Sequence, residues 1–269
     1  MSVIKAVVFD GAGTMIDFGC VAPVQALRAV FAAEGAPIGG PDARRDMGRA
    51  KRDHVRALLG YPEVRQAWSA AHGRAPDEGD VSRIHDALEP LMREAAMAHS
   101  ELIAGAAEVA RDLKARGVAI GSCTGYTRPM MAPILPLAAA QGYAPSVVIC
   151  AGETLEGRPS PLMLWKALVE LGAWPARACV KVDDAEVGIG EGRAAGAWTV
   201  GVSASGNGVG LSAADYAALP AGERRDRVDR SAAGLRAAGA DFVIETVADL
   251  PGVLDQIDRR VAAGERPGA

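Results

Sequence analysis

Short apolar segments that alternate with helical stretches are the feature of this sequence that most restricts its fold. Segments rich in β-branched residues occur at residues 4–9, 118–123, 146–150, 178–182, 198–202 and 240–245. From the second segment onward, stretches with a helical spacing of apolar residues lie between them, as at 106–117 and 161–172. Strands that alternate with helices predict a parallel sheet with helices on its faces. We therefore expect an α/β fold with a Rossmann-like, doubly wound parallel sheet.

The connection between the first two strands breaks this alternation. It contains only stretches with helical spacing, each ending near Gly or Pro, at residues 23–35, 41–60, 63–73 and 80–99. This pattern predicts an all-helical cap domain at residues 21–100, inserted into a core domain made of residues 1–20 and 101–269. Residues 203–230, where Gly, Ser and Asn precede a charged stretch, are predicted to be a surface excursion.

Charge and hydropathy exclude several classes of function. The formal net charge is -4, and 29 basic residues are interleaved with 33 acidic ones, so no cationic surface for nucleic acid is expected. No apolar stretch approaches the ~20 residues that span a bilayer, and the N-terminus does not resemble a signal peptide. The four cysteines are widely spaced, which argues against a zinc site or a disulfide framework. We expect a cytoplasmic protein that acts on a small molecule.

Polar residues follow several of the predicted strands. Asp10 comes after the first strand, Thr124 after the second, Arg158 after the third and the Asp183–Asp184 pair after the fourth. Ligands of open parallel sheets bind at the carboxyl ends of the strands, so these residues should converge. Carboxylates suit Mg²⁺, while a hydroxyl and a guanidinium suit phosphoryl oxygens. Each Asp alone could equally be a turn former or a helix cap, but together they predict a phosphoryl-transfer site.

Longer motifs extend this pattern along nearly the whole chain. They are "VVFDGAGT", "DFGCVAP", "MGRAKRDHVRALL", "GSCTGYTRPMM", "QGYAPSVV", "GRPSPLM", "EGRAAGAWTVGV" and "GADFVIET". With them the chain resembles the haloacid-dehalogenase superfamily and, within it, the phosphonoacetaldehyde hydrolases, or phosphonatases. The segments around Lys51 and Tyr126 are the most specific part of this resemblance.

The resemblance implies hydrolysis of the C–P bond of phosphonoacetaldehyde to acetaldehyde and phosphate. Asp10 would attack phosphorus to form an aspartyl-phosphate, and Lys51 would form an imine with the aldehyde. Mg²⁺ would be held by Asp10, the Ala12 carbonyl and Asp184, with Asp183 close by. The resemblance also implies a homodimer formed through the helical insertion.

Simple chemistry supports the assignment of Lys51. Carbon is a poor leaving group unless an adjacent electron sink accepts the bonding pair, and a protonated imine is such a sink. Lys51 is the only lysine between Lys5 and Lys114, so the helical block offers one candidate. The nearby Arg49, Arg52 and His54 should disfavour its ammonium form.

Ala12 fits the same chemistry. Phosphatases of this superfamily usually carry a second Asp two residues after the nucleophile, which protonates a departing alkoxide. An enamine leaving group needs no such proton, and Ala12 removes a negative charge that would favour the ammonium form of Lys51. The alternative is that Ala12 marks a decayed phosphatase site.

The remaining site residues follow from spacing and resemblance. Met47, Lys51 and His54 share one face of a predicted helix, which could otherwise be a solvated charged helix. In family terms Met47, His54, Cys20, Gly125 and Tyr126 line the substrate pocket, and His54 and Tyr126 are candidates for proton transfer. Cys20 is expected to act as a small buried hydrophobic residue rather than as a nucleophile.

The match departs from the family pattern beside the phosphate site. Gly11 stands where a bulky aromatic is common, and Met15 where Thr is usual. In "DDAEVG", Gly188 replaces an acid, and Asp183 could take over its role through a water. The substrate could therefore be a related 2-oxo-alkylphosphonate. Two other functions stay open, a phosphatase acting on a small phosphomonoester and a protein that binds a phosphorylated metabolite without turnover.

Overall fold

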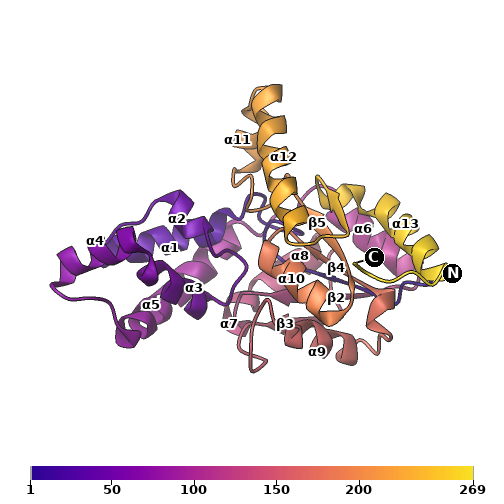
Figure 1. Ribbon diagram of the computed structural model, residues 1–269, viewed down its shortest axis with the longest axis horizontal. Helices are drawn as coiled ribbons and strands as arrows, with labels where there is room; N and C mark the ends of the chain where they lie inside the picture. Colours follow the sequence, from indigo (N-terminus) through magenta and orange to yellow (C-terminus); the bar gives the residue numbers. More distant parts are fainter. Residues whose placement is uncertain (1, 269) are drawn as a thin grey trace.

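A six-stranded parallel sheet forms the centre of the computed structural model, which describes residues 2–268 (Figure 1). The strand order is β3-β2-β1-β4-β5-β6, and every neighbouring pair is parallel. The strands are β1 (Ala6–Phe9), β2 (Ala119–Thr124), β3 (Val147–Cys150), β4 (Cys179–Asp183), β5 (Trp198–Val202) and β6 (Phe242–Ile244). The predicted doubly wound α/β fold is confirmed.

The order of the strands fixes where a ligand can bind. The chain starts in β1, adds β2 and β3 on one side, and then returns to add β4 on the other side of β1. Such a reversal opens a crevice beyond the carboxyl ends of the two strands at the switch point. The residues that end or follow β1 and β4 therefore lie side by side at this crevice.

Helices cover both faces of the sheet. One face packs against α6 and α13, and the other against α9, α10 and α12. Because both faces are covered, the strands are continuously apolar rather than alternating. These helices, with the shorter ones between them, are α6 (Ala106–Ala115), α7 (Arg128–Met131), α8 (Ile134–Ala140), α9 (Leu162–Glu170), α10 (Glu186–Ala195), α11 (Ala213–Ala218), α12 (Ala221–Ala237) and α13 (Leu250–Ala262).

A helical segment lies between β1 and β2 and extends from one end of the sheet (Figure 1). It consists of α1 (Val21–Ala33), α2 (Gly40–Arg44), α3 (Lys51–Gly60), α4 (Pro62–His72) and α5 (Glu78–Ala98). Buried Leu27 and Leu88 belong to an apolar core in which α1 packs against α5. The division into a core domain, 1–20 and 101–269, and a cap domain, 21–100, remains our proposal.

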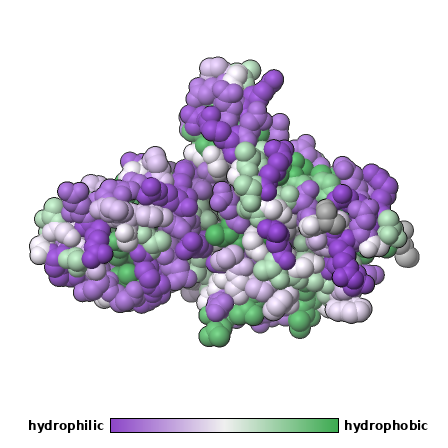
Figure 2. Space-filling model, in the orientation of Figure 1, coloured by the Kyte–Doolittle hydropathy of each residue, from purple (hydrophilic) through white to green (hydrophobic). Residues whose placement is uncertain are grey.

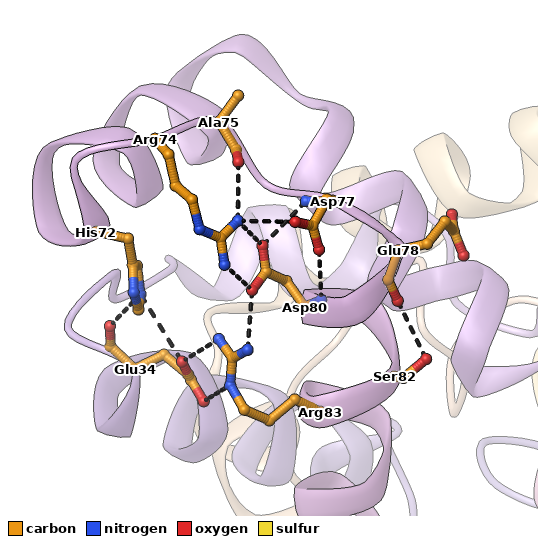
Figure 3. A network of polar contacts seen from close by, with 9 residues as sticks. All are labelled: Glu34, His72, Arg74, Ala75, Asp77, Glu78, Asp80, Ser82 and Arg83. Atoms are coloured by element: carbon orange, nitrogen blue, oxygen red, sulfur yellow. Dashed lines mark hydrogen bonds and ion pairs between the residues drawn. The ribbon is translucent and has the colours of Figure 1, made fainter.

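A buried carboxylate ties the ends of these helices together. Asp80 accepts hydrogen bonds from Arg74 and Arg83 and from the backbone N–H of Asp77, which caps α5 (Figure 3). Arg83 also pairs with Glu34, just after α1. These bonds lie within the helical segment, so they hold its shape without contacting the sheet. Its outward face is mostly hydrophilic (Figure 2).

Two sequence-based predictions are wrong in detail. Residues 41–60 do not form one helix, because Gly48 has a φ of 93° and breaks the chain between α2 and α3. A Cβ there would lie 2.8 Å from the side chains of Ala185 and Val187, so glycine at this position also allows close contact with the start of α10. Residues 203–230 are not wholly a surface excursion, since Ser203 and Ser205 are buried and only α11 and α12 project outward (Figure 1).

No helix within residues 2–268 combines the length and the apolar character that crossing a membrane requires.

Candidate active site

Three carboxylates meet at the switch point of the sheet. Asp10 follows β1, Asp183 ends β4, and Asp184 comes next. All three are buried, and their oxygens lie within 4.8 Å of one another. The convergence that the sequence predicted is therefore present, and these acids could hold a metal ion.

Two of these acids have raised pKa values. Burial, and then the charges of Asp10 and Asp183, raise the pKa of Asp184 to about 8. Burial also raises the pKa of Asp10, with Arg158 acting in the opposite direction. Like charges brought together away from water repel each other, and a divalent cation would relieve that repulsion. Three carboxylates are the hard oxygen donors that Mg²⁺ prefers.

Arg158 contacts the carboxylate of Asp10, the candidate nucleophile. Its Nη1 atom lies 2.8 Å from Asp10 Oδ1 and 3.4 Å from Asp183 Oδ2, and its Nε lies 3.0 Å from Glu191 Oε2. A further donor of the guanidinium bonds to the Cys123 carbonyl. These contacts fix the guanidinium plane, so its positive charge stays beside Asp10.

Lys181 and Glu191 complete this buried network, and neither was among the site residues predicted from the sequence. Lys181 Nζ lies 3.0 Å from Asp183 Oδ2 and 3.2 Å from Glu191 Oε2. Neither side chain is exposed. A buried charge is strongly unfavourable unless it is paired. A lysine inside the apolar strand "CVKV" was therefore a signal that an acid lies opposite.

Asp183 occupies the space that a side chain at position 188 would need. A Cβ on Gly188 would lie 2.0 Å from both Cγ and Oδ2 of Asp183. The glycine and the additional aspartate are therefore a matched pair in this fold. This geometry supports the hypothesis that Asp183 takes over the role of the acid absent at position 188.

Asp184 is oriented by three donors from separate parts of the chain. Its Oδ1 accepts from Thr14 Oγ1 at 3.2 Å, and its Oδ2 accepts from the Asn207 N–H at 2.8 Å and from Cys20 Sγ at 3.3 Å. Burial, followed by the charge of Asp184, raises the pKa of Cys20 well above its usual range. Cys20 therefore stays a thiol and serves as a donor, a role beyond that of the buried hydrophobic residue we expected.

A narrow cleft in front of the acids is shared by the sheet edge and the helical segment. Water-sized space within it amounts to about 20 Å³, roughly enough for one water molecule. Most of the predicted site residues face it. The lining consists of Asp10, Ala12, Cys20, Pro23, Met47, Gly48, Lys51, Thr124, Gly125, Tyr126, Asp184 and Ala185.

Lys51 brings an amine to this cleft from the first position of α3. Lys51 is 2% exposed, and burial lowers its pKa from 10.5 to about 8, although the negative charge of Asp10 acts in the opposite direction. The N-terminal end of the helix dipole also disfavours an ammonium ion. The predicted cause was wrong, because Arg49 and Arg52 have side chains 43% and 44% exposed, and burial makes the largest contribution.

Met47 and His54 depart from the predicted arrangement. Met47 precedes α3 rather than sharing a helix with Lys51, yet it reaches the cleft because the chain turns at Gly48. His54 is buried behind Lys51 and does not line the cleft. Burial and the positive charges of Lys51 and Arg49 lower the pKa of His54 to about 3, so its ring is neutral near pH 7. The expected acidity for proton transfer is therefore absent.

Residues at the end of β2 and just after it form the cleft wall near Lys51. Thr124 is buried, and its Oγ1 accepts a hydrogen bond from the Tyr126 N–H at 3.2 Å. The Tyr126 hydroxyl has no hydrogen-bond partner among the residues that the structure describes. The centroid of the Tyr126 ring lies 5.5 Å from Lys51 Nζ. A Cβ on Gly125 would lie 2.7 Å from the Arg49 carbonyl, so only glycine lets the helical segment close this tightly.

Gly11 and Met15, the two residues close to Asp10 that differ from the family pattern, have different surroundings. A Cβ on Gly11 would meet only Thr124 Oγ1, at 3.8 Å, so the glycine leaves space beside the phosphate turn. Met15 is fully buried in the apolar core between the sheet and α6. Its side chain therefore does not shape the cleft.

Comparison with known proteins gives the family. A family model described as haloacid dehalogenase-like hydrolase matches residues 4–196. The chain is a haloacid dehalogenase-like hydrolase. This hydrolase is 47% identical, over 99% of its length and 100% of the relative's, to the phosphonoacetaldehyde hydrolase of Paraburkholderia xenovorans. It is 42% identical to that of Nitratidesulfovibrio vulgaris, covering 98% and 94% of the two chains.

A solved structure gives the same result. The crystal structure of a phosphonoacetaldehyde hydrolase-like protein from Oleispira antarctica superposes on the hydrolase with a TM-score of 0.97. The two chains are 42% identical, and the match covers 98% of this chain and 96% of the other. The family resemblance that the motifs indicated is confirmed.

Substitution of Gly188 by alanine tests the packing of Asp183. The new methyl group would collide with a carboxylate that Lys181 holds in place, so Gly188→Ala should lower the free energy of unfolding by about 1–3 kcal/mol. The control is Gly222→Ala near the start of α12, where a Cβ meets nothing within 4 Å. Urea unfolding measures both, and equal stabilities of the two variants would refute the account.

The lowered pKa of Lys51 predicts how stability depends on pH. Well below pH 8 the amine is protonated in both states, and between about pH 8 and 10.5 the unfolded chain binds more protons than the folded one. The stability of the wild type relative to Lys51→Met should therefore rise with pH in that window, by up to about 1.4 kcal/mol per pH unit. Urea unfolding of both proteins at several pH values measures the difference. A difference independent of pH would contradict the assignment.

Proposed function

We propose that this hydrolase cleaves the C–P bond of phosphonoacetaldehyde to give acetaldehyde and phosphate. The observation that carries the proposal is the placement of a buried amine, Lys51, in the same closed cleft as the Asp10 carboxylate. Ala12 lines that cleft where a phosphatase would have a second acid. The names of the full-length relatives agree with this reaction.

The first step uses the amine of Lys51. With a pKa of about 8, a useful fraction of the amine is free near neutral pH and can attack the aldehyde carbon. Loss of water then gives an imine, whose protonated form is the electron sink. Tyr126 lines the cleft and its hydroxyl has no hydrogen-bond partner within residues 2–268, so we assign it the bond to the carbonyl oxygen while the imine forms.

The second step breaks the bond between phosphorus and carbon. A carboxylate oxygen of Asp10 attacks phosphorus, and the bonding pair moves onto the substrate to leave an enamine. Thr124, which lines the cleft, holds a phosphoryl oxygen, and Arg158 keeps a positive charge beside Asp10. Water then releases phosphate from Asp10. The enamine takes up a proton on carbon, and hydrolysis of the resulting imine frees acetaldehyde and Lys51.

We assign Mg²⁺ to the three carboxylates. Asp10, Asp184 and the Ala12 carbonyl would hold the ion, with Asp183 bonding through a water. Bound there, Mg²⁺ supplies positive charge to the phosphoryl oxygens. The chain's own contribution is the orientation of Asp184 by Thr14 and Cys20.

Substrate entry requires the cap to open. The closed cleft has room for about one water, far less than an aldehyde phosphonate occupies. Residues 21–100 would therefore move as a cap relative to the sheet and close over bound substrate, which also excludes water. From the family resemblance we further propose that the protein is a homodimer.

Two alternative reactions remain on the same scaffold. A phosphatase acting on a small phosphomonoester would use Asp10, Thr124 and Arg158 without Lys51, but it would lack an acid at position 12 to protonate the alkoxide. A related 2-oxo-alkylphosphonate would undergo the same imine chemistry. The space beside Gly11 favours some tolerance of the latter.

Substitution of Lys51 separates these reactions. The wild type with Mg²⁺ should release phosphate from phosphonoacetaldehyde, and Lys51→Ala should lose that activity by on the order of 10³-fold or more, because it lacks the imine. Any hydrolysis of p-nitrophenyl phosphate should be unchanged by Lys51→Ala and abolished by Asp10→Asn. Phosphate release measures all three proteins. Full activity of Lys51→Ala on the phosphonate would refute the proposal.

A further inference from the structure

The closed helical segment is bonded to the core through one arginine. Arg44, the last residue of α2, donates from Nη1 to the Gly19 carbonyl at 2.8 Å and to Asn207 Oδ1 at 3.0 Å. Its Nη2 donates to the Gly210 carbonyl at 2.8 Å. Two of these three acceptors belong to the loop after β5, far from Arg44 in the sequence, so the guanidinium bridges the two parts of the chain.

The loop after β5 is shaped to receive this side chain. Asn207 Nδ2 donates back to the Arg44 carbonyl at 3.0 Å, so the two residues bond reciprocally. Gly210 has a φ of 68°, and a Cβ there would lie 2.8 Å from Arg44 Nε. Both the conformation and the close approach require glycine.

The same loop also bears on the catalytic acids. The backbone N–H of Asn207 donates to Asp184 Oδ2, while its side chain bonds to Arg44. A movement of α2 away from the sheet would break the bonds between Arg44 and the loop whose Asn207 N–H orients Asp184. Closure of the helical segment and the position of this carboxylate are therefore mechanically connected.

We propose that Arg44 and Asn207 form a latch that holds the helical segment closed over the cleft. Both are positioning residues, which act through the closure of the cleft and through Asp184. We assign the latch the purpose of keeping Lys51 facing Asp10 during the reaction, and this purpose rests on the proposed function. The existence of the latch does not depend on that function.

Other charged contacts of the helical segment are unsuited to this task. Arg45 pairs with Glu63, and Arg74 pairs with Asp80, so both pairs are internal to the segment. Beside the cleft, the helical segment and the core instead touch at Gly48 and Gly125, where the glycine backbone allows a close approach. Such contacts form in the closed state but are weak individually. Charge-assisted bonds of Arg44 are the directional interactions that favour closure.

Chemical labelling of lysines measures the opening of the cleft without substrate or metal. Lys51 in the cleft and Lys181 inside the sheet are both buried, so each reacts with an amine reagent only when its surroundings open. Cleft opening exposes Lys51 alone, whereas global unfolding exposes both. The ratio of the two labelling rates, obtained by mass spectrometry, therefore isolates movement of the helical segment.

In Arg44→Ala the ratio of Lys51 to Lys181 labelling should rise by about tenfold, the size expected when hydrogen bonds to a charged group are lost. Asn207→Ala should raise the ratio less, because two acceptors of Arg44 remain. The double variant should exceed Arg44→Ala but stay below the product of the two single effects, because the bond between Arg44 Nη1 and Asn207 Oδ1 is lost in both single variants, whereas the bond from Asn207 Nδ2 to the backbone carbonyl of residue 44 is lost only with Asn207. The control is Arg45→Ala, which removes an adjacent arginine paired within the segment and should leave the ratio unchanged.

Three results would overturn the latch. They are an unchanged ratio in Arg44→Ala, an equal rise for both lysines, which indicates general destabilisation, and a double variant whose effect is the product of the single effects. None of these depends on turnover. If the wild type released no phosphate from phosphonoacetaldehyde, the proposed function would fail, while the labelling would still decide the latch.

Discussion

The burial of the Lys51 amine between the helical segment and the sheet edge is the constraint on which the rest of the site depends. Removal from water lowers its pKa to about 8, and the same enclosure reduces the cleft to the size of one water molecule. The close contact between the helical segment and the sheet edge thus both lowers the pKa of the amine and excludes water from the cleft. Glycines at positions 48 and 125 permit this contact, because a side chain at either position would push the helical segment away from the core.

Charge balance in the buried site explains several residues that carry no chemistry of their own. Asp10, Asp183 and Glu191 lie against Arg158 and Lys181, which makes it possible to bury all five. Asp184 stands outside these pairs and has a raised pKa, as expected for the carboxylate that most needs a cation. Gly188 and Asp183 depend on each other, because the space that a side chain at position 188 would need is filled by the Asp183 carboxylate.

The sequence was informative where a feature repeats or where topology brings residues together. Alternating strands and helices predicted the sheet, and the rule for open sheets placed Asp10, Thr124, Arg158 and Asp183 at one edge. Contacts between distant segments were not predictable, since nothing in local pattern links Asn207 to Asp184 or Arg44 to Gly210. The lowered pKa of Lys51 was predicted, but from neighbours in sequence, whereas burial in the folded chain is its main cause.

Reductive trapping tests the central claim most directly. Borohydride added to the wild type during turnover of phosphonoacetaldehyde should reduce the imine to a stable secondary amine, and peptide mass spectrometry should find the ethyl or phosphonoethyl adduct on Lys51. A folded, magnesium-loaded protein that gives no adduct, or one that carries it on another lysine, would contradict the account.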